Sequence, residues 1–183
     1  MNLPYSIETS RLRLRRLSEA DAQVVFDRWA TDPDVTRYMS WPRHRTLDDS
    51  LSFIAFSDAQ WTRWSAGPYL IETLCGGTAI GSCGFGFQSD AQAEIGYVLA
   101  SEFWGLGYAT ECVHALVAVA RTVAPIELFA PVHPDNVASM SVLRKCGFAL
   151  DTQGVSVRFP NICGDTEVRA SRFFLSLPQC VAV

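Results

Sequence analysis

A strand, a glycine-containing loop and the start of a helix follow one another between residues 94 and 111, and together they could bind an anion. The strand is expected at Glu94 to Leu99, the loop contains Gly105 and Gly107, and the helix is expected from Gly107 to Ala120. The first turn of a helix has unpaired N–H groups and a partial positive charge, and glycine lets a phosphate approach them closely. The loop lacks the Gly-Lys-Ser/Thr ending of a P-loop and the three spaced glycines of a dinucleotide site. A strand-to-helix turn in which the glycines only relieve strain is therefore the alternative.

A second segment, residues 133–148, carries polar residues and a glycine at the two ends of an expected helix. Asn136 stands where an N-cap belongs, Ser139 follows three residues later, and Gly147 suits the left-handed residue that ends a helix. Each of these roles can be purely structural. The two segments are informative as a pair, because a single expected strand, residues 126–131, separates their helices.

Composition limits the classes of protein that can carry these segments. With 183 residues, 49% apolar and 19% charged, the chain has the size and core of one globular domain rather than the profile of a disordered protein. Its net charge of −4 disfavours a general nucleic-acid-coating role. No apolar run is long enough to span a membrane and the first ten residues show no secretion signal, so we expect a cytoplasmic protein. Scattered cysteines and histidines predict neither a disulfide framework nor a metal site.

Hydrophobic periodicity and turn residues predict a mixed α/β sheet with helices packed on it, in the order β-α-α-β-β-β-α-β-α-β-β. Leucine and arginine alternate in the first strand, as in a half-buried strand whose arginines face solvent. Gly76 and Gly77 predict a hairpin, and three glycines in its return strand indicate bulges or a close backbone neighbour. Residues 32–34 are expected to end the first helix, and residues 161–165 to form a turn. The expected strands are residues 11–17, 69–74, 78–87, 94–99, 126–131, 148–158 and 168–177, and the expected helices are residues 19–30, 46–64, 107–120 and 136–146.

The two segments together resemble a known family. Trp104-Gly-Leu-Gly-Tyr-Ala109 resembles the Gln/Arg-x-x-Gly-x-Gly/Ala motif with which GNAT N-acetyltransferases bind acyl-CoA, and the stretch from Asn136 to Phe148 resembles their second cofactor motif. Residues 8–16 and 35–42 are similar to the RimJ/RimL branch, which is named for enzymes that acetylate the N-termini of ribosomal proteins. The likeness extends over roughly residues 7–177, and the combination of motifs is more specific than any one of them.

This resemblance implies a single GNAT domain over residues 1–183, with a mostly antiparallel sheet that splays between its fourth and fifth strands and about four flanking helices. It implies an acyltransferase that uses acetyl-CoA and no metal, and that acetylates the amine of a protein N-terminus or of a small molecule in a ternary complex. It suggests no nucleic-acid or membrane partner, and dimers are common among similar proteins. A CoA-binding module without catalysis and an enzyme that uses another thioester, such as succinyl-CoA, are the alternatives.

The resemblance also assigns residues to the cofactor. The pantetheine arm would pair with the main chain around Tyr97 to Leu99, the pyrophosphate would lie over the loop after Trp104, and Asn136 would reach the arm. Trp104 stands where Gln or Arg is common in the family, so backbone amides would have to hold the phosphates, and Leu143 stands where many relatives have a tyrosine near the sulfur. The expected cofactor-binding residues are Tyr97, Val98, Leu99, Trp104, Gly105, Leu106, Gly107, Tyr108, Ala109, Thr110, Asn136, Ser139 and Lys145.

Glu94 is the first candidate for the base that accepts the proton of the amine. Alternation along the strand places it on the same face as Gly96 and Val98 and opposite Tyr97, so the role requires that this face look into the acceptor cleft. A carboxylate that merely pairs on the sheet surface is the alternative. Ser139 is the candidate for the group near the sulfur, by its position in the family motif, with a surface hydroxyl as the alternative; an amide of the strand could stabilise the oxyanion. Weaker candidates for the base are Glu102, Asp165 and Glu167.

The resemblance implies an acceptor site built by the first two helices, the loop between them and the last hairpin. Aromatic residues gather in this part of the sequence and could line an apolar or cation-binding pocket, although core packing explains most aromatic residues. Basic residues of the loop could bind an acidic acceptor, with simple solvation as the alternative. The aromatic residues are Trp29, Tyr38, Trp41, Trp61 and Trp64, and the loop residues are Arg37, Arg43, His44 and Arg45.

Overall fold

A computed structural model describes residues 3–89, 91–122 and 126–177 of the chain. These residues form one eight-stranded sheet in the order β1-β2-β3-β4-β5-β6-β8-β7, in which β5 and β6 are parallel and every other described pair is antiparallel. The strands are β1 (Ser6–Glu8), β2 (Leu12–Arg16), β3 (Pro68–Thr73), β4 (Ala79–Ser89), β5 (Gln92–Leu99), β6 (Ile126–Val132), β7 (Ala149–Arg158) and β8 (Glu167–Leu177).

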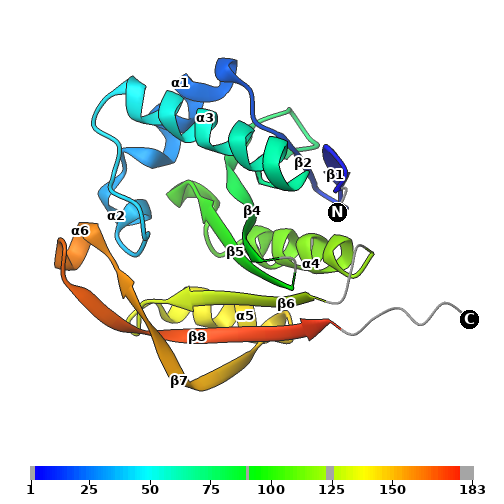
Figure 1. Ribbon diagram of the computed structural model, residues 1–183. Helices are drawn as coiled ribbons and strands as arrows, with labels where there is room; N and C mark the ends of the chain where they lie inside the picture. The colour runs from blue at the N-terminus through cyan, green and yellow to red at the C-terminus, as the bar shows by residue number, and fades with distance from the viewer. Residues whose placement is uncertain (1–2, 90, 123–125, 178–183) are drawn as a thin grey trace, which may run out of the picture.

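Helices cover both faces of this sheet (Figure 1). The first helices pack against one face, where Trp29, Ile54 and Val98 belong to one buried cluster. The later helices pack against the other face, where Leu116 and Leu143 belong to a second buried cluster. No helix in the described ranges is long and apolar enough to cross a membrane. The α-helices are α1 (Ala22–Val25), α2 (Pro33–Thr36), α3 (Leu47–Trp64), α4 (Tyr108–Ala120), α5 (Val137–Lys145) and α6 (Pro160–Cys163).

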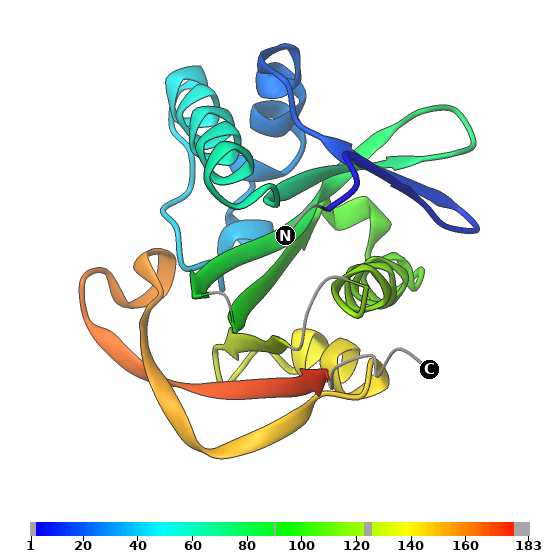
Figure 2. The ribbon, with the colours of Figure 1, turned by 45° about the vertical axis from the view of Figure 1, so that its right-hand side comes forward.

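The sheet opens between β5 and β6, as the resemblance predicts. Pairing between these strands is confined to Gln92–Glu94 of β5 and Glu127–Phe129 of β6, although β5 continues to Leu99 and β6 to Val132. Figure 2 shows β6, β8 and β7 as a section of the sheet that turns away below β4 and β5. The two strands are the fourth and fifth of the expected strands but the fifth and sixth of the observed ones. The numbering differs because β1 was not expected, since a strand of three residues is too short to give a periodic pattern. Residues 95–99 therefore have no partner strand on the side of β6.

The expected strands and the other helices are present with small differences at their ends, whereas the helix expected at residues 19–30 consists of a 3-10 turn (Glu19–Asp21), α1 and a π-helical turn (Phe26–Ala30). Residues 32–34 do not simply end a helix, because Pro33 begins α2. The Asp32 carboxylate accepts hydrogen bonds from the N–H groups of Asp34 (2.8 Å) and Val35 (3.3 Å), and proline is well suited to the first position of a helix. The expected turn at residues 161–165 likewise overlaps the end of α6, another single helical turn.

Glycines in β4 and β5 hollow out the middle of the sheet. A Cβ on Gly81 would collide with the Val98 carbonyl oxygen, and one on Gly84 would lie 2.6 Å from the Gly67 carbonyl oxygen, so the predicted close backbone neighbour is confirmed at both positions. Gly86 differs, since the nearest atom to a Cβ there would be the Cβ of Glu94 at 4.0 Å. The space around Glu94 is therefore left open by its neighbour on β4.

Candidate functional site

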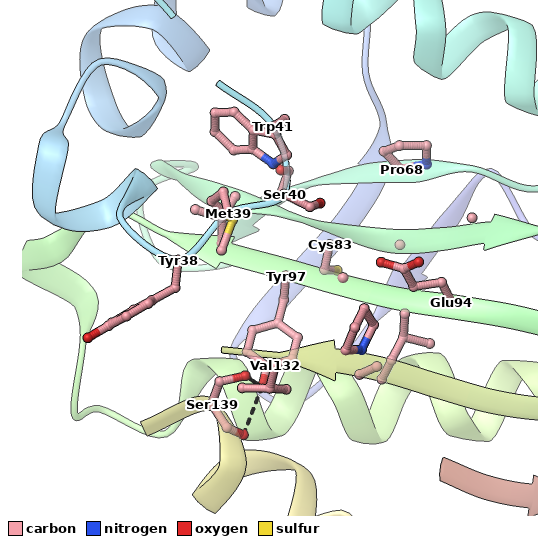
Figure 3. Close-up of a pocket in the computed structure, with 18 of the residues that line it drawn as sticks. Tyr38, Met39, Ser40, Trp41, Pro68, Cys83, Glu94, Tyr97, Val132 and Ser139 are labelled. Atoms are coloured by element: carbon pink, nitrogen blue, oxygen red, sulfur yellow. Dashed lines mark hydrogen bonds between the residues drawn. The ribbon is translucent and has the colours of Figure 1, made fainter. Parts of the chain in front are cut away.

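A cleft of about 230 Å³ opens where β5 separates from β6 (Figure 3). Its floor is the middle of β4 and β5, where Gly84, Gly86 and Gly96 carry no side chain. The loop from Tyr38 to Trp41 and α3 form one wall, and the end of β6 with the start of α5 forms the other. The cleft thus joins the expected acceptor side to the expected cofactor side.

Glu94 projects into this cleft from β5, on the side of Pro68 (Figure 3). Burial raises the pKa of its carboxyl, and no hydrogen bond or ion pair joins the carboxylate to another described residue. The predicted face of the strand therefore does look into the cleft, and the carboxylate does not pair on the sheet surface. It is the one carboxylate among the described lining residues, and Glu102, Asp165 and Glu167 lie outside the lining.

The main chain at the end of β5 presents hydrogen-bonding groups to the open side of the sheet. The Ala100 N–H donates to β4 (2.9 Å), whereas the Leu99 carbonyl accepts from the indole N–H of Trp104 (2.8 Å). Because these groups alternate in direction along a strand, the N–H and C=O of Tyr97 and the N–H of Leu99 point toward the gap. Those of Val98 point into β4, so this residue reaches the cleft only through its side chain.

The phenol of Tyr97 extends to α5 and holds Ser139 (Figure 3). The two hydroxyl oxygens are 2.8 Å apart, and the Tyr97 O–H lies 3.1 Å from the Ser139 carbonyl oxygen, to which it can donate. Burial raises the pKa of the Tyr97 phenol, so it stays protonated at neutral pH. Ser139 lines the cleft, and its hydroxyl is held in position rather than free on the helix surface. No local sequence pattern indicates this contact, apart from the alternation that turns Tyr97 away from Glu94.

Asn136 both caps α5 and lines the cleft, so the two roles expected of it are compatible. Its Oδ1 accepts a hydrogen bond from the Ser139 N–H (3.1 Å), which satisfies one of the unpaired donors of the helix. Its amide nitrogen has no hydrogen-bond partner among the described residues. That nitrogen is free to donate to a ligand in the cleft.

The loop between β5 and α4 has the left-handed geometry that its glycines supply. Gly105 and Gly107 have φ of 75° and 83°, and Gly107 is the N-cap of α4. The first bond of the helix runs from the Glu111 N–H to the Gly107 carbonyl (3.1 Å), so the N–H groups of residues 108–110 have no backbone partner in the described chain. The indole N–H of Trp104 is bonded to the Leu99 carbonyl, and the residue is 49% exposed.

Arg11 ties this loop to the N-terminal hairpin, a contact that the sequence did not predict. Its guanidinium donates to the Leu106 carbonyl (3.0 Å) and to the Glu111 carboxylate (2.7 Å), and lies 4.4 Å from the ring centre of Tyr108. The same carboxylate accepts from the hydroxyls of residues 9 and 10 and from the Arg11 N–H. Although burial opposes the effect, these hydrogen bonds lower the pKa of Glu111. We call this contact the Arg11–Glu111 clasp.

A second groove, of about 650 Å³, runs along α4 beside the glycine loop. Gly107 and Thr110 line it, and so do Lys145 at the end of α5 and residues 7–10 of the N-terminal hairpin. Three of the expected cofactor residues, from segments 35 residues apart, are therefore brought to one surface. Leu106 precedes Gly107, Tyr108 and Ala109 begin α4, and none of these three residues lines the groove.

The expected acceptor aromatics divide between cleft and core. Tyr38 and Trp41 line the cleft, together with phenylalanines from α3 and the last hairpin that the sequence did not single out. Trp29 and Trp61 are each buried in one of the two core clusters. Trp64 stacks on Phe87, which packs against the cluster that contains Trp61, with 5.7 Å between the ring centres. None of the four basic loop residues lines the cleft among the described residues, namely Arg37, Arg43, His44 and Arg45.

The sheet that opens between two parallel strands, with a glycine loop and helix at the opening, is the fold of an acyl-CoA N-acyltransferase. The chain belongs to the GNAT acetyltransferase domain family, whose model matches residues 11–149. It is 31% identical over 146 residues to N-acetyltransferase p20 of Bacillus licheniformis, covering 78% of this chain and 82% of the relative. The protein is thus an acetyl-CoA-dependent acyltransferase.

Solved structures share this fold. The microcin C7 self-immunity acetyltransferase MccE, in complex with acetyl-CoA and AMP, superposes with a TM-score of 0.79 at 20% identity, over 94% of this chain and 97% of that one. RimL, a ribosomal α-N-protein acetyltransferase in complex with coenzyme A, superposes with a TM-score of 0.77 at 20% identity, over 96% and 97%. At this level of identity the likeness concerns the fold alone.

Proposed function

We propose that the protein is an N-acetyltransferase of the RimJ/RimL-like branch, which acetylates a primary amine by direct attack in a ternary complex. The proposal rests on one arrangement: the Glu94 carboxylate, the Tyr97 N–H and the Ser139 hydroxyl meet at one cleft, where the sheet opens. The sequence at residues 8–16 and 35–42, which is similar to that branch, supports the assignment to the branch. When bound, acetyl-CoA supplies a thioester carbonyl that an amine can attack, with the thiol as leaving group.

The residues present fit acetyl-CoA along one path. The open edge of β5 offers the N–H and C=O of Tyr97 and the N–H of Leu99 to an extended, amide-bearing arm. The unpaired N–H groups of residues 108–110, reached across Gly105 and Gly107, suit a pyrophosphate. We assign the free amide nitrogen of Asn136 to the arm and Lys145, at the second groove, to a phosphate at the far end of the cofactor.

Three groups would carry the chemistry. Glu94 accepts a proton from the ammonium form of the acceptor, and the neutral nitrogen then attacks the thioester carbonyl; the raised pKa of Glu94 makes it a stronger base than an exposed glutamate. The Tyr97 N–H donates to the carbonyl oxygen, where negative charge develops. As the carbon–sulfur bond breaks, the Ser139 hydroxyl donates a hydrogen bond to the sulfur and keeps its proton, while the Tyr97 phenol holds that hydroxyl at 2.8 Å. The thiolate is protonated by the second proton that the nitrogen loses when the tetrahedral intermediate collapses. A thiol pKa near ~8.5 makes sulfur a tolerable leaving group, so the contribution of Ser139 is modest.

We further propose that residues 1–183 form one GNAT domain, since the family match and the single sheet together extend from the first strand to the last. The acceptor is an amine, either a protein N-terminus or a small molecule. A cytoplasmic location and a homodimeric state are carried over from the sequence and its resemblance alone.

Release of the CoA thiol in the presence of peptides and small amines tests this function. We expect turnover with acetyl-CoA, a fall of roughly 10²–10⁴-fold in Glu94→Gln, and no change in Glu102→Gln, whose carboxylate lies outside the cleft. Acetyl-CoA binding without turnover of any amine would support the non-catalytic module instead. Faster thiol release from succinyl-CoA than from acetyl-CoA would show that another acyl group is the substrate.

A further inference from the structure

We infer that the acceptor is a primary amine carried on a small apolar or aromatic body that bears no carboxylate or phosphate group. This inference rests on the proposed function and deepens it, because it names the chemical class that the acceptor half of the same cleft can hold. We define the acceptor half by the lining residues of the loop after α2 and of α3, which are Tyr38, Met39, Ser40, Trp41, Phe53 and Phe56.

The charge of the cleft disfavours acidic acceptors. Among the described residues that line it, Glu94 is the one carboxylate and none is lysine or arginine. Arg37, the basic residue next to the lining, lies with its guanidinium 5.4 Å from the ring centre of Tyr38 and outside the lining itself. A second carboxylate in the cleft would be partly desolvated beside Glu94 without a cation to compensate it. An ammonium group, by contrast, is attracted by the same carboxylate before it gives up its proton.

The wall of the acceptor half is fixed before any acceptor binds. Asn161 of α6 donates from its side-chain amide to the carbonyls of Thr36 (2.8 Å) and Trp41 (3.0 Å), and its Oδ1 accepts from the Arg43 N–H (2.9 Å). In both ribbon views α6 lies beside the segment that follows α2 (Figures 1 and 2). Three hydrogen bonds from one side chain thus hold the loop in a defined position, which reduces the entropy lost when an acceptor binds.

Aromatic rings continue from this loop to the end of β6. The Tyr38 ring stacks on His133 with 5.1 Å between ring centres, and His133 meets Phe159 edge-on at 5.0 Å. Aromatic faces attract both apolar groups and cations. The cleft volume of about 230 Å³ is below the roughly 300–1,000 Å³ of pockets for drug-sized ligands. The space therefore suits a small amine or the first residue of a peptide.

Two matched pairs of acceptors test the inference by thiol release. The first pair is 2-phenylethylamine and L-phenylalanine, which differ by the carboxylate. 2-Phenylethylamine is the more basic of the two, so a smaller fraction of it is neutral at a given pH. The amine pKa therefore cannot explain a preference for 2-phenylethylamine. The second pair is an Asn-Ala-Ala amide and an Asp-Ala-Ala amide, which places the same contrast in a peptide. We expect kcat/KM to be at least ~30-fold higher for the member without the carboxylate, in whichever pair is turned over.

Two variants connect this preference to the cleft. Ser40→Arg adds a cation to the lining, and we expect it to reduce the preference by about 10-fold or more. Trp41→Ala removes part of the aromatic wall and should raise KM for the aromatic amines by about 10-fold. Trp64→Ala is the matched control, because this indole packs on the core beside Phe87 and outside the lining.

The outcomes separate the inference from the function on which it depends. Turnover of the acidic member at a rate similar to or above that of its partner overturns the inference and leaves the acetyltransferase proposal intact. A preference that Ser40→Arg and Trp41→Ala both leave unchanged also overturns it, since the selectivity would then arise elsewhere. Calorimetry with acetyl-CoA is run in parallel: no cofactor binding refutes the proposed function itself, whereas turnover of other amines but of none of these four acceptors overturns the inference alone.

Discussion

Replacement of Gly107 by valine tests whether the loop before α4 holds the phosphates of acetyl-CoA. Gly107 has φ of 83°, and a Cβ there would lie 3.5 Å from Nη2 of Arg11. Left-handed backbone costs a non-glycine residue about 1–2 kcal/mol, and more for a β-branched one, so the variant should relax and displace the N–H groups of residues 108–110. If two charge-assisted hydrogen bonds of about 1.5–3 kcal/mol each are lost, the affinity for acetyl-CoA falls by roughly 10²–10⁴-fold.

Gly76→Val is the matched control for this backbone cost. Gly76 has φ of 88° in the hairpin between β3 and β4, and a Cβ there would meet only Thr78, at 3.8 Å. Both variants should therefore lose similar thermal stability, whereas only Gly107→Val should lose cofactor affinity in calorimetry. If Gly107→Val stays folded and binds acetyl-CoA within about 3-fold of the unmodified protein, the loop does not hold the phosphates and the proposed cofactor path is wrong.

Three further predictions concern the base, the clasp and the group near the sulfur. Glu94→Gln should lower kcat/KM most at pH values above the raised pKa of Glu94 and below the amine pKa, which is ~7.7–8.0 for an α-amine. In this range the amine is protonated and needs a base, whereas a neutral amine does not. An unchanged pH profile of kcat/KM would exclude Glu94 as the base. Arg11→Met should raise KM for acetyl-CoA about 3–10-fold at constant kcat, because the Arg11–Glu111 clasp holds the glycine loop. Arg13→Met is the control and should leave KM unchanged, since Arg13 forms only an exposed ion pair with Glu8. Equal effects of the two variants on KM would refute a role of the clasp in cofactor binding. Ser139→Ala should lower kcat by about 10-fold and Tyr97→Phe should lower it by less, which single-turnover rates would measure. An unchanged rate in Ser139→Ala would exclude Ser139 as the group that assists departure of the sulfur.

The elements of the fold were predictable because each is encoded within a few neighbouring residues. Leu12 and Leu14 alternate with arginines, and both are fully buried in β2. Ser18 and Thr46 each form a capping box with an aspartate three residues later, so both helix starts could be located from the sequence. The same alternation in β5 predicted that Glu94 and Val98 share a face, and the structure confirms that this face looks into the cleft.

Contacts between distant segments were not predictable in the same way. The arginines of β2 have the pattern of a solvated strand face, and nothing near Arg11 indicates that it reaches Glu111, a hundred residues later. Trp41 and Trp61 are equally aromatic, yet one lines the cleft and the other is buried with its indole N–H on the Pro68 carbonyl (3.0 Å). Periodicity marks a side chain as buried, but only the tertiary arrangement decides whether it faces a core or a cavity.

Trp104 illustrates how a departure from a family motif acquires a structural reason. The sequence shows only that Gln or Arg is replaced, which removes a side chain that could hold a phosphate. In the structure the indole N–H satisfies the Leu99 carbonyl at the end of β5, where no partner strand remains. An unpaired carbonyl at that position would otherwise face the cleft. The Trp104 indole N–H is thus already used within the protein, which agrees with the proposal that backbone N–H groups hold the phosphates of the cofactor.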